Sequence, residues 1–391
     1  MQEFTAGPDD EGRRLDRVLR RILPDVPLSA IHRVLRKGAV RVDGRRAQAG
    51  YRLQPGETIR IPAGLVDDAV TERERLQTAA GAGRRSGSIA LLATGPHLIA
   101  VNKPPGMATH GPGSLQQLVN EHLRHAAEGS LAFRPAPLHR LDRGTSGVVI
   151  CGASIHGARR FSQLLRERRV VKWYLGLFSC RIESACTWRD RLVRDRKTGI
   201  TRAAVAGNRG TGETPGQLAG DRRDVRKEEE RRKRPSSRTE TRPAAAEHEA
   251  VLEVFPMLHS RTAMRPAPTT TLAAVRLQTG RRHQVRAQAA ARDCPLVGDT
   301  RYGGPPAGGG YVLHAVRLEL TDGTELLGQA AVSAPLPAPA RQRLARVFRE
   351  DAIVEALSLF SRGSSPTELP QPSDTALDPA AVEAFHTAHR E

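Results

Sequence analysis

Cysteine is scarce in this chain, with four residues at positions 151, 180, 186 and 294. None of them is spaced as Cys-x-x-Cys, so the sequence predicts neither a zinc site nor a disulfide framework. No apolar run is long enough to span a bilayer, and the first ten residues lack the basic start and apolar stretch of a signal peptide. We therefore expect a cytoplasmic protein with reduced thiols and no membrane-spanning segment.

Acidic residues are also in deficit. The chain has 42 Asp and Glu against 61 Lys and Arg, which is a formal net charge of +19. Such an excess points to a polyanionic partner, either nucleic acid or an acidic membrane surface. The 391 residues suffice for two or three domains with a sizeable core.

Residues 13–62 are predicted to form a small separate module. Apolar residues recur at helical spacing at Leu15, Val18, Leu19 and Ile22. Ser29 is placed to cap a second helix that ends at Gly38, and alternating residues around an Asp-Gly turn then predict strands. The module has 13 Arg and Lys against four acids, which indicates either a solvated basic face or a polyanion-binding surface.

The remaining flanking segments lack the pattern of a packed domain. Residues 1–12 are expected to be a flexible N-terminus, and the Gly-, Ala- and Arg-rich residues 63–87 a linker. Residues 207–246 are a low-complexity insertion with no apolar face. Residues 341–391 are expected to form a partly disordered C-terminal extension with one helix near residues 353–360.

The most informative stretch is residues 137–150. It places Asp142 between Arg140 and Arg143, before a Gly-Thr-Ser-Gly turn and an apolar run. The neighbouring cations favour an ionised carboxylate, and a charge constellation on a loop before a strand is typical of a functional site. A surface ion-pair cluster is the alternative interpretation.

This stretch resembles the catalytic motif of the RluA-like pseudouridine synthases, which isomerise uridine in RNA. Further segments resemble that family's other motifs in the same order, at residues 99–110, 171–177, 277–286, 295–303 and 313–318. The resemblance extends over residues 88–340 apart from the insertion. Residues 13–62 are similar to the small alpha-L RNA-binding domain first seen in a ribosomal small-subunit protein.

The resemblance implies an α+β protein. Residues 88–340 would form a catalytic domain with the pseudouridine synthase fold, a bent, mainly antiparallel mixed sheet with flanking helices, behind a small N-terminal α/β RNA-binding domain. The expected reaction breaks the glycosidic bond of a uridine, turns the uracil and rejoins it through carbon, without a metal or cofactor. Large-subunit ribosomal RNA is the expected partner, with transfer RNA left open, and the protein is expected to be a monomer. The insertion would be a tolerated surface loop or an RNA-gripping arm.

The resemblance also implies three catalytic residues. Asp142 would attack the anomeric carbon or take a sugar proton, and the sequence leaves both routes open. Tyr174 would stack on the base and move a proton, unless it is an ordinary core aromatic. Arg286 would be the buried ion-pair partner of Asp142, because a buried acid is tolerable only when it is paired.

Other residues are expected to bind RNA. His139 and Arg140 would flip the target base out of its stack and hold the backbone, although a simple ion pair with Asp142 is the alternative for Arg140. The other expected RNA-binding residues are Arg143, Lys103, Lys172, Arg281, His283 and Gln284. For the two lysines a solvated surface position is the alternative, and Tyr302 is expected to pack near the cleft.

Two other functions stay open. An inactive RNA-binding ribosome-assembly factor could share the fold, but it would not need Asp142, Tyr174 and Arg286 together. A carboxylate-dependent glycosidase needs two acids that flank the scissile bond, and no second acid accompanies Asp142 in its motif.

Overall fold

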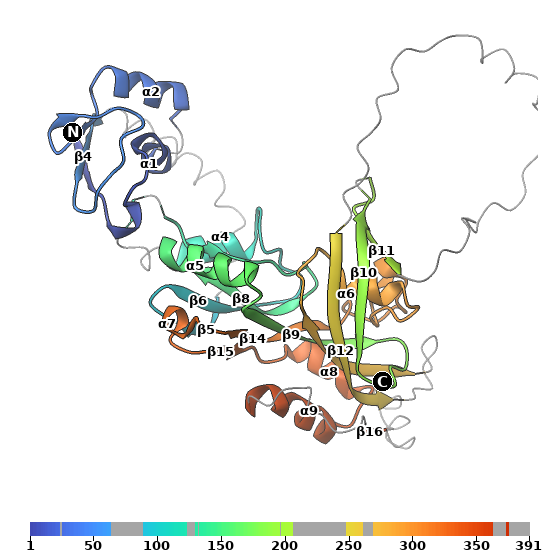
Figure 1. The fold of residues 1–391 in the computed structure, drawn as a ribbon. Coiled ribbons are helices and arrows are strands. Elements are labelled where there is room, and N and C mark those ends of the chain that lie inside the picture. Colours follow the sequence, from blue (N-terminus) through green and yellow to red (C-terminus); the bar gives the residue numbers. More distant parts are fainter. Residues whose placement is uncertain are drawn as a thin grey trace, which may run out of the picture.

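The computed structural model describes residues 1–23, 26–63, 89–122, 130–131, 133–195, 197–205, 248–260, 269–362 and 373–374. The expected linker (but for residue 63), the insertion 207–246 and the end of the C-terminal extension lie outside these residues. The described part consists of a small N-terminal domain, blue in Figure 1, and a larger sheet domain. None of its helices has the length and apolar character needed to cross a membrane.

The N-terminal domain packs two helices against a four-stranded sheet. Its strands, in spatial order, are β1 (Gln2–Thr5), β4 (Thr58–Ile61), β2 (Arg41–Val42) and β3 (Arg45–Arg46). The helices are α1 (Leu15–Ile22) and α2 (Leu28–Arg36). Leu15, Val18 and Leu19 are fully enclosed, so the apolar face of the first helix forms part of the domain's core.

Two features of this domain differ from expectation. Residues 1–12 belong to the domain, because β1 pairs with β4 in antiparallel register and Asp10 is fully buried. The second helix begins at Leu28, directly after Pro27, so Ser29 lies inside its first turn and does not cap it. The helix ends before Gly38, whose φ of 72° is the left-handed conformation that a glycine provides there.

Two acidic residues attach the N-terminal domain to the sheet domain. The Asp9 carboxylate accepts a hydrogen bond of 3.0 Å from the backbone N–H of Ile155, the first residue of α5 (Ile155–Arg166). Asp10 accepts hydrogen bonds from the Ser130 hydroxyl at 2.8 Å and the Leu131 N–H at 2.7 Å. A carboxylate at a helix N-terminus is favoured by the helix dipole, so the contact with α5 is both a hydrogen bond and a charge match.

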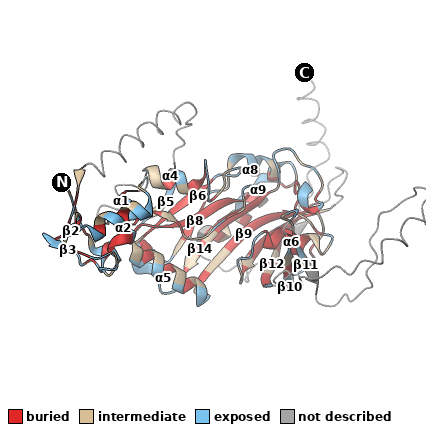
Figure 2. Cartoon of the chain, turned by 90° about the horizontal axis from the view of Figure 1, so that it is seen from above, coloured by how far each residue is buried: buried red, intermediate tan, exposed pale blue. Residues whose placement is uncertain are grey.

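The sheet domain is built on one 12-stranded, mainly antiparallel sheet. The main path runs β11-β10-β12-β13-β9-β14-β8-β6-β5, with β7, β15 and β16 attached to β8, β14 and β12. The strands are β5 (Ala90–Thr94), β6 (Leu98–Lys103), β7 (Ala136–Pro137), β8 (Ser146–Gly152), β9 (Val170–Phe178), β10 (Cys186–Arg194), β11 (Thr201–Val205), β12 (His248–Ser260), β13 (Thr270–Leu277), β14 (Leu313–Leu320), β15 (Ala331–Ser333) and β16 (Ser373–Asp374). The strands β8 and β9 in the middle are almost wholly buried (Figure 2).

Helices flank this sheet. Besides α5 they are α4 (Leu115–His122), α6 (Gln284–Ala290), α7 (Thr324–Leu327), α8 (Ala338–Ala345) and α9 (Glu350–Arg362). Leu344, Phe348, Ile353 and Phe360 are buried in one cluster with side chains of β9, β12 and β13. Residues 341–362 therefore complete the core of the sheet domain and are not an extension beyond it.

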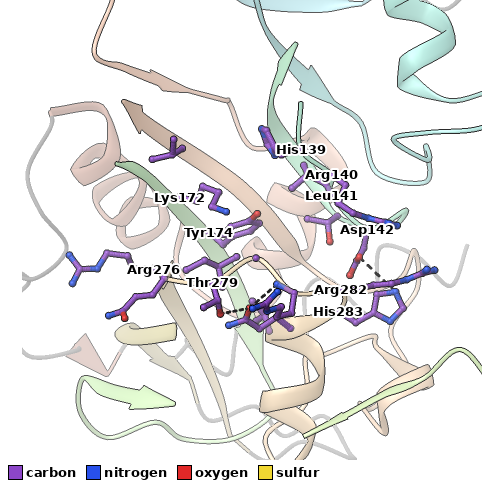
Figure 3. A pocket seen from close by; sticks show the side chains of 18 of the residues that line it. His139, Arg140, Leu141, Asp142, Lys172, Tyr174, Arg276, Thr279, Arg282 and His283 are labelled. Atoms are coloured by element: carbon purple, nitrogen blue, oxygen red, sulfur yellow. Dashed lines mark hydrogen bonds and ion pairs between the residues drawn. The ribbon is translucent and has the colours of Figure 1, made fainter. Parts of the chain in front are cut away.

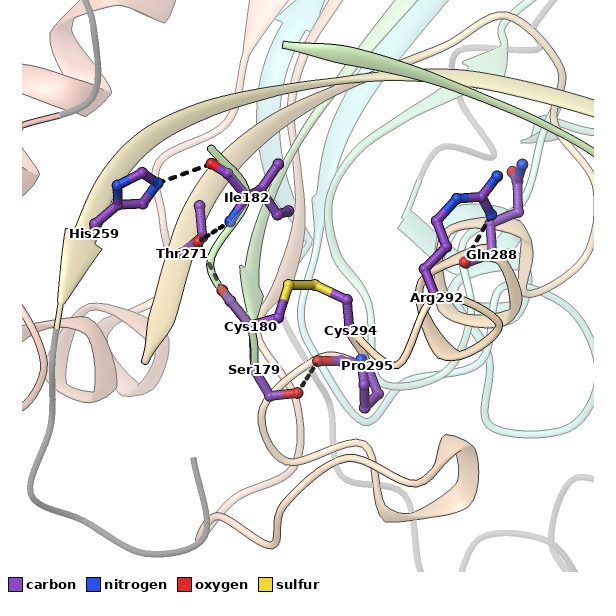
Figure 4. Close-up of a disulfide and its surroundings, with 9 residues drawn as sticks. All are labelled: Ser179, Cys180, Ile182, His259, Thr271, Gln288, Arg292, Cys294 and Pro295. Carbon is purple, nitrogen blue, oxygen red and sulfur yellow. Dashed lines mark hydrogen bonds between the residues drawn. A yellow bond between two sulfur atoms is a disulfide. The ribbon is translucent and has the colours of Figure 1, made fainter. Parts of the chain in front are cut away.

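The structure contradicts the expectation of four reduced thiols, because Cys180 and Cys294 form a disulfide (Figure 4). The two residues are 114 apart in sequence, and their Cα atoms lie 5.0 Å apart. Backbone pairing brings them together, since the Ser179 N–H donates to the Pro295 carbonyl at 2.8 Å and the Val297 N–H to the Leu177 carbonyl at 2.9 Å. The spacing of cysteines in the sequence cannot predict this disulfide, because it depends on the pairing of two extended segments that are far apart in the chain.

Replacing residues 207–246 by a bridge of about eight Gly and Ser residues is expected to leave the sheet domain folded. Val205 of β11 and Ala250 of β12 both pair with Asp190 of β10, so the bridge must cross two strand spacings, about 10 Å. Shortening a loop of about 40 residues to eight should stabilise the fold by roughly 1.4 kcal/mol. Thermal melting measures this, and an insoluble or unfolded product would show that the insertion is structural. Where RNA binding of the deletion variant is measured as well, the control is a variant in which the residues of the insertion are in scrambled order, because it keeps the charge of the insertion.

Candidate active site

A cleft of about 790 Å³ lies beside the central strands β9 and β13. Its walls come from the loop between β7 and β8, the start of β9, the turn after β13 and the start of α6, as Figure 3 shows. This volume is typical of a small-molecule or nucleotide site. The cleft therefore lies where the segments with the family-like motifs meet.

The loop that carries Asp142 is hydrogen-bonded to residues 99–110. The Thr109 hydroxyl donates to the Leu141 carbonyl at 2.9 Å and accepts from the Leu141 N–H at 3.1 Å. The Asp142 carbonyl accepts from the Thr145 N–H at 3.0 Å, which closes the turn. Leu141 is buried, so the backbone on both sides of Asp142 is fixed while its carboxylate faces the cleft (Figure 3).

The Asp142 carboxylate faces two side chains at the start of α6, those of the N-cap residue His283 and of Arg286 in the first turn. Its Oδ1 lies 3.7 Å from Nε2 of His283, and its Oδ2 lies 3.7 Å from a terminal nitrogen of Arg286. Burial raises the pKa of Asp142, and the nearby Arg286, Arg140 and Arg282 partly oppose this. The carboxyl group is therefore poorly hydrated and surrounded by cations, an environment typical of a functional nucleophile or base.

Arg286 pairs with Asp142 at 3.7 Å, in agreement with the sequence-based prediction, but it has a second and closer acidic partner. Its guanidinium donates two hydrogen bonds of 2.7 Å to the two oxygens of Asp299. The guanidinium carbon also lies 4.6 Å from the ring centres of both Tyr302 and Tyr311. A planar guanidinium favours two parallel bonds to one carboxylate and stacking on aromatic faces, and the remaining nitrogen is left to face Asp142.

Tyr174 lies on β9 with its side chain at the cleft (Figure 3). It is 6% exposed, and burial raises the pKa of its hydroxyl, with the nearby Asp142 adding to the shift. The phenol is therefore protonated at neutral pH and has a proton to give. Tyr174 and the Asp142 loop both line the cleft.

Lys103 is not an available phosphate contact. Its side chain is fully buried, and Nζ donates to the carbonyls of Pro104 at 3.0 Å, Met107 at 2.8 Å and Arg143 at 3.4 Å. Burial lowers the pKa of Lys103 to about 8, against the opposing pull of Asp142. The ammonium holds the Lys-Pro-Pro-Gly turn against the Asp142 loop, so its role is structural.

His139 and Gln284 are also engaged by the protein itself. Nε2 of His139 accepts from the Ile150 N–H at 2.9 Å, and burial lowers the pKa of this imidazole to about 3. The buried Gln284 amide accepts from the Arg281 N–H at 3.0 Å and donates to the Val251 carbonyl at 3.1 Å. Both expected RNA contacts instead fix loops of the cleft, because their polar atoms satisfy backbone groups.

The other expected contacts divide by position. Arg140, Lys172, Arg281 and His283 line the cleft, whereas Arg143 is exposed and lies outside its lining. Sequence reasoning missed four further cations of the lining, Arg166, Arg168, Arg276 and Arg282. It also missed Asp299, although the 295–303 motif contains it. The sequence around these residues does not identify them as part of the site. Their positions in the three-dimensional structure do.

The described lining has eight cationic side chains and a single carboxylate, Asp142. A second acid, Asp299, has a side chain that is 1% exposed and bound by Arg286. Hydrolysis by paired acids needs two free carboxyl groups about 5–9 Å apart, which this arrangement does not offer. One carboxylate, one neutral phenol and a rim of cations suit attack on a sugar that carries phosphates on both sides.

Comparison with known proteins finds two family models that match parts of the chain. Residues 97–291 match the model described as RNA pseudouridylate synthase, and residues 13–59 match the S4 domain. The chain is 37% identical over 176 residues to the ribosomal large subunit pseudouridine synthase C of Escherichia coli K12, covering 43% of this chain and 51% of that protein. For the protein of the same name from Vibrio parahaemolyticus the identity is 33% over 186 residues, covering 46% and 55%.

A solved structure, "Human RNA Pseudouridylate Synthase Domain Containing 4", is 20% identical, with a TM-score of 0.47 over 71% of this chain and 97% of that one. The matched segments combine an RNA-binding type of domain with a synthase domain. The chain belongs to the RNA pseudouridylate synthase family. It spans about half the length of the curated relatives it matches.

Proposed function

We propose that this protein is an RNA pseudouridine synthase, an isomerase that converts specific uridines to pseudouridine. The observation that carries the proposal is Asp142, the single carboxylate of the described cleft lining, held on a fixed loop among cations in the same cleft as Tyr174. Breaking the glycosidic bond releases a uracil anion that is stabilised by its own carbonyls. One carboxylate near the ribose therefore suffices to attack the anomeric carbon or to take a sugar proton.

The other residues receive roles that follow from their positions. Tyr174, with its protonated hydroxyl, would stack on the uracil and exchange a proton when the carbon–carbon bond is complete. Arg140 is exposed at the cleft, two residues before Asp142, and would occupy the stack vacated by a flipped base. Lys172, Arg281 and the further cations of the lining would hold the phosphates on either side of the target.

We propose large-subunit ribosomal RNA as the substrate, because the curated relatives bear the name ribosomal large subunit pseudouridine synthase. The protein would act as a monomer in the cytoplasm. Residues 1–63 would form the RNA-binding domain and residues 89–362 the catalytic domain. In this arrangement the first domain binds the RNA and the second carries out the reaction.

Pseudouridine mapping of total RNA tests the proposal. A strain that lacks the protein should lose one or a few pseudouridines from its large-subunit ribosomal RNA, and the wild-type gene should restore them. A gene encoding Asp142→Asn should not restore them. An unchanged pseudouridine map in the deletion strain would contradict the proposed activity, and a loss confined to transfer RNA would contradict the proposed substrate.

Removing residues 1–64 is expected to weaken RNA binding more than catalysis. Each lost phosphate contact should lower the slope of log affinity against log salt by about 0.7 to 0.9. We expect weaker binding, a shallower slope and a raised KM, with the chemical step on bound RNA slowed less. Filter-binding titrations at several salt concentrations measure this.

A full-length control guards against damage caused by the truncation. Arg33, Arg36 and Lys37 lie exposed on or next to α2, away from the contacts of Asp9 and Asp10 with the sheet domain. Replacing these three by Ala should reproduce part of the affinity loss without altering the melting temperature. Identical affinity and slope in both variants would leave the domain without a role in RNA binding.

A further inference from the structure

A chain of hydrogen bonds leads from the edge strand β11 to the side of the cleft. The backbone N–H of Thr201 donates to the Tyr302 hydroxyl at 3.1 Å, and this hydroxyl lies 2.8 Å from Nδ1 of His283. Tyr302 and His283 are each 8% exposed. The far side of the imidazole places Nε2 at 3.7 Å from Oδ1 of Asp142 (Figure 3).

The position of the protons on this chain follows from counting donors. Tyr302 has one hydroxyl proton and already accepts from the Thr201 N–H. If Nδ1 of His283 were protonated, the hydroxyl would accept twice and its own proton would have no acceptor among the described residues. The arrangement that satisfies every group has Tyr302 donating to an unprotonated Nδ1.

The other end of the ring requires the same tautomer. A carboxylate has only acceptors, so an unprotonated Nε2 would set its lone pair against Oδ1 of Asp142. With Nδ1 unprotonated, Nε2 carries the single proton of a neutral imidazole and presents an N–H to that oxygen. Tyr302 on one side and Asp142 on the other therefore select one tautomer independently.

The imidazole is also uncharged at neutral pH. Burial, assisted by Arg286, Arg282 and Arg301, lowers the pKa of His283 to about 4, against a smaller opposing effect of Asp299. A second proton would join a cluster that is already cationic. The ring thus acts as a neutral donor and not as a third counter-ion beside the arginines.

We propose that His283 is a positioning residue for the reaction, a neutral imidazole held as the Nε2–H tautomer by Tyr302 and directed at one oxygen of Asp142. Arg286 faces the other oxygen at 3.7 Å, so the two side chains together define the rotation of the carboxylate about its Cβ–Cγ bond. A preorganised neutral donor such as His283 acts on the reacting group without adding charge. The inference rests on the proposed function, because it assigns Asp142 the reactive role.

The backbone offers a way to separate this role from a structural one. His283 has a φ of 55° at the N-cap of α6, a left-handed conformation that Asn tolerates better than most residues. The Asn side chain overlays Nδ1 and can still accept from Tyr302, but it does not reach Asp142. The Gln side chain overlays Nε2 and retains an N–H toward Asp142, although it suits the backbone less well.

His283→Asn and His283→Gln form the decisive pair. If His283 positions Asp142, the Asn variant should lose kcat by at least about tenfold, with its KM and melting temperature close to wild type. The Gln variant should retain at least about a third of the wild-type kcat. The reverse order, with Asn the more active variant, would overturn the proposal in favour of a backbone role.

The tautomer itself can be observed without RNA. Long-range ¹⁵N–¹H correlation of histidine-labelled protein, with the His283 signals assigned through His283→Asn, should show a neutral ring protonated at Nε2. Tyr302→Phe should weaken the preference for this tautomer, which then depends on Asp142 alone, and lower kcat. A ring protonated at Nδ1, or doubly protonated at pH 7, would overturn the proposal. Wild-type protein that forms no pseudouridine would count against the proposed function and leave the tautomer result standing.

Discussion

Asp142→Asn protein is expected to bind RNA as the wild type does and to form essentially no pseudouridine. The amide has the shape of the carboxylate but is neither nucleophile nor base, so the rate should fall by three orders of magnitude or more, as is usual when the central reactive group is removed (about 10³ to 10⁶). Mass-spectrometric or tritium-release assays of pseudouridine formation measure this.

The same variant should not lose stability. Burial raises the pKa of Asp142 above its usual value, so ionising this group at neutral pH disfavours the folded state. The cost is absent well below the usual carboxyl pKa and grows as the pH rises through the folded pKa. The Asn variant lacks it, and its melting temperature at pH 7 should equal or exceed that of the wild type.

Asp293→Asn is the matched control for this experiment. Asp293 is exposed, lies outside the cleft lining and has a φ of 52° that Asn readily adopts. This variant should behave as wild type in binding, melting and turnover. Pseudouridine formation by Asp142→Asn at a rate near that of Asp293→Asn would remove Asp142 from the mechanism.

Arg286→Met is expected to lower both stability and activity severely. The substitution leaves the carboxylate of Asp299, which is 1% exposed, without its two hydrogen bonds. Breaking one side of a buried pair costs about 3–5 kcal/mol, which corresponds to a fall in melting temperature of roughly 6–20 °C for a domain of about 200 residues. Thermal melting and turnover on bound RNA measure the two effects separately.

The double variant Arg286→Met/Asp299→Leu separates the two partners of this arginine. Removing the orphaned acid should restore most of the melting temperature, because apolar replacements of a buried pair are often neutral. Activity should stay low, since no cation then faces Asp142 from this position. Recovery of activity along with stability would mean that Arg286 acts only through Asp299, and no recovery of stability would contradict their pairing. Arg286→Lys retains the charge but not the paired bonds, and we expect it to lie between wild type and Met in both measurements.

The order of the sequence motifs was sufficient to indicate where the site would be. Asp142 lies on a loop before β8, and Tyr174 lies within the nine-residue strand β9. Hydrophobic patterning along the chain is enough to assign both residues to these elements. The helical spacing of Leu15, Val18 and Leu19 likewise predicted the buried face of α1. These features are local, because side-chain periodicity and turn chemistry act over a few residues.

The side-chain partners were decided by the tertiary structure. Charge and motif membership predicted Lys103, His139 and Gln284 as RNA contacts, but in the structure each of them bonds backbone groups of the protein itself. The Gln284 partner, Val251, is 33 residues away in the chain. The positions of these residues in the sequence could not show that Arg286 would lie closer to Asp299 than to Asp142. A buried donor binds whichever acceptor the packing brings within about 3 Å, and that acceptor can lie anywhere in the chain.

The sequence by itself therefore determined the two-part organisation, the basic character of the protein and the choice of Asp142 as the candidate reactive carboxylate. The tertiary structure alone decided the pairing of β1 with β4, the joining of Cys180 to Cys294 and the contact of His283 with Tyr302. The difference has one physical cause. Local conformation follows from neighbouring residues, whereas the satisfaction of buried polar groups depends on contacts between segments that are far apart in the chain.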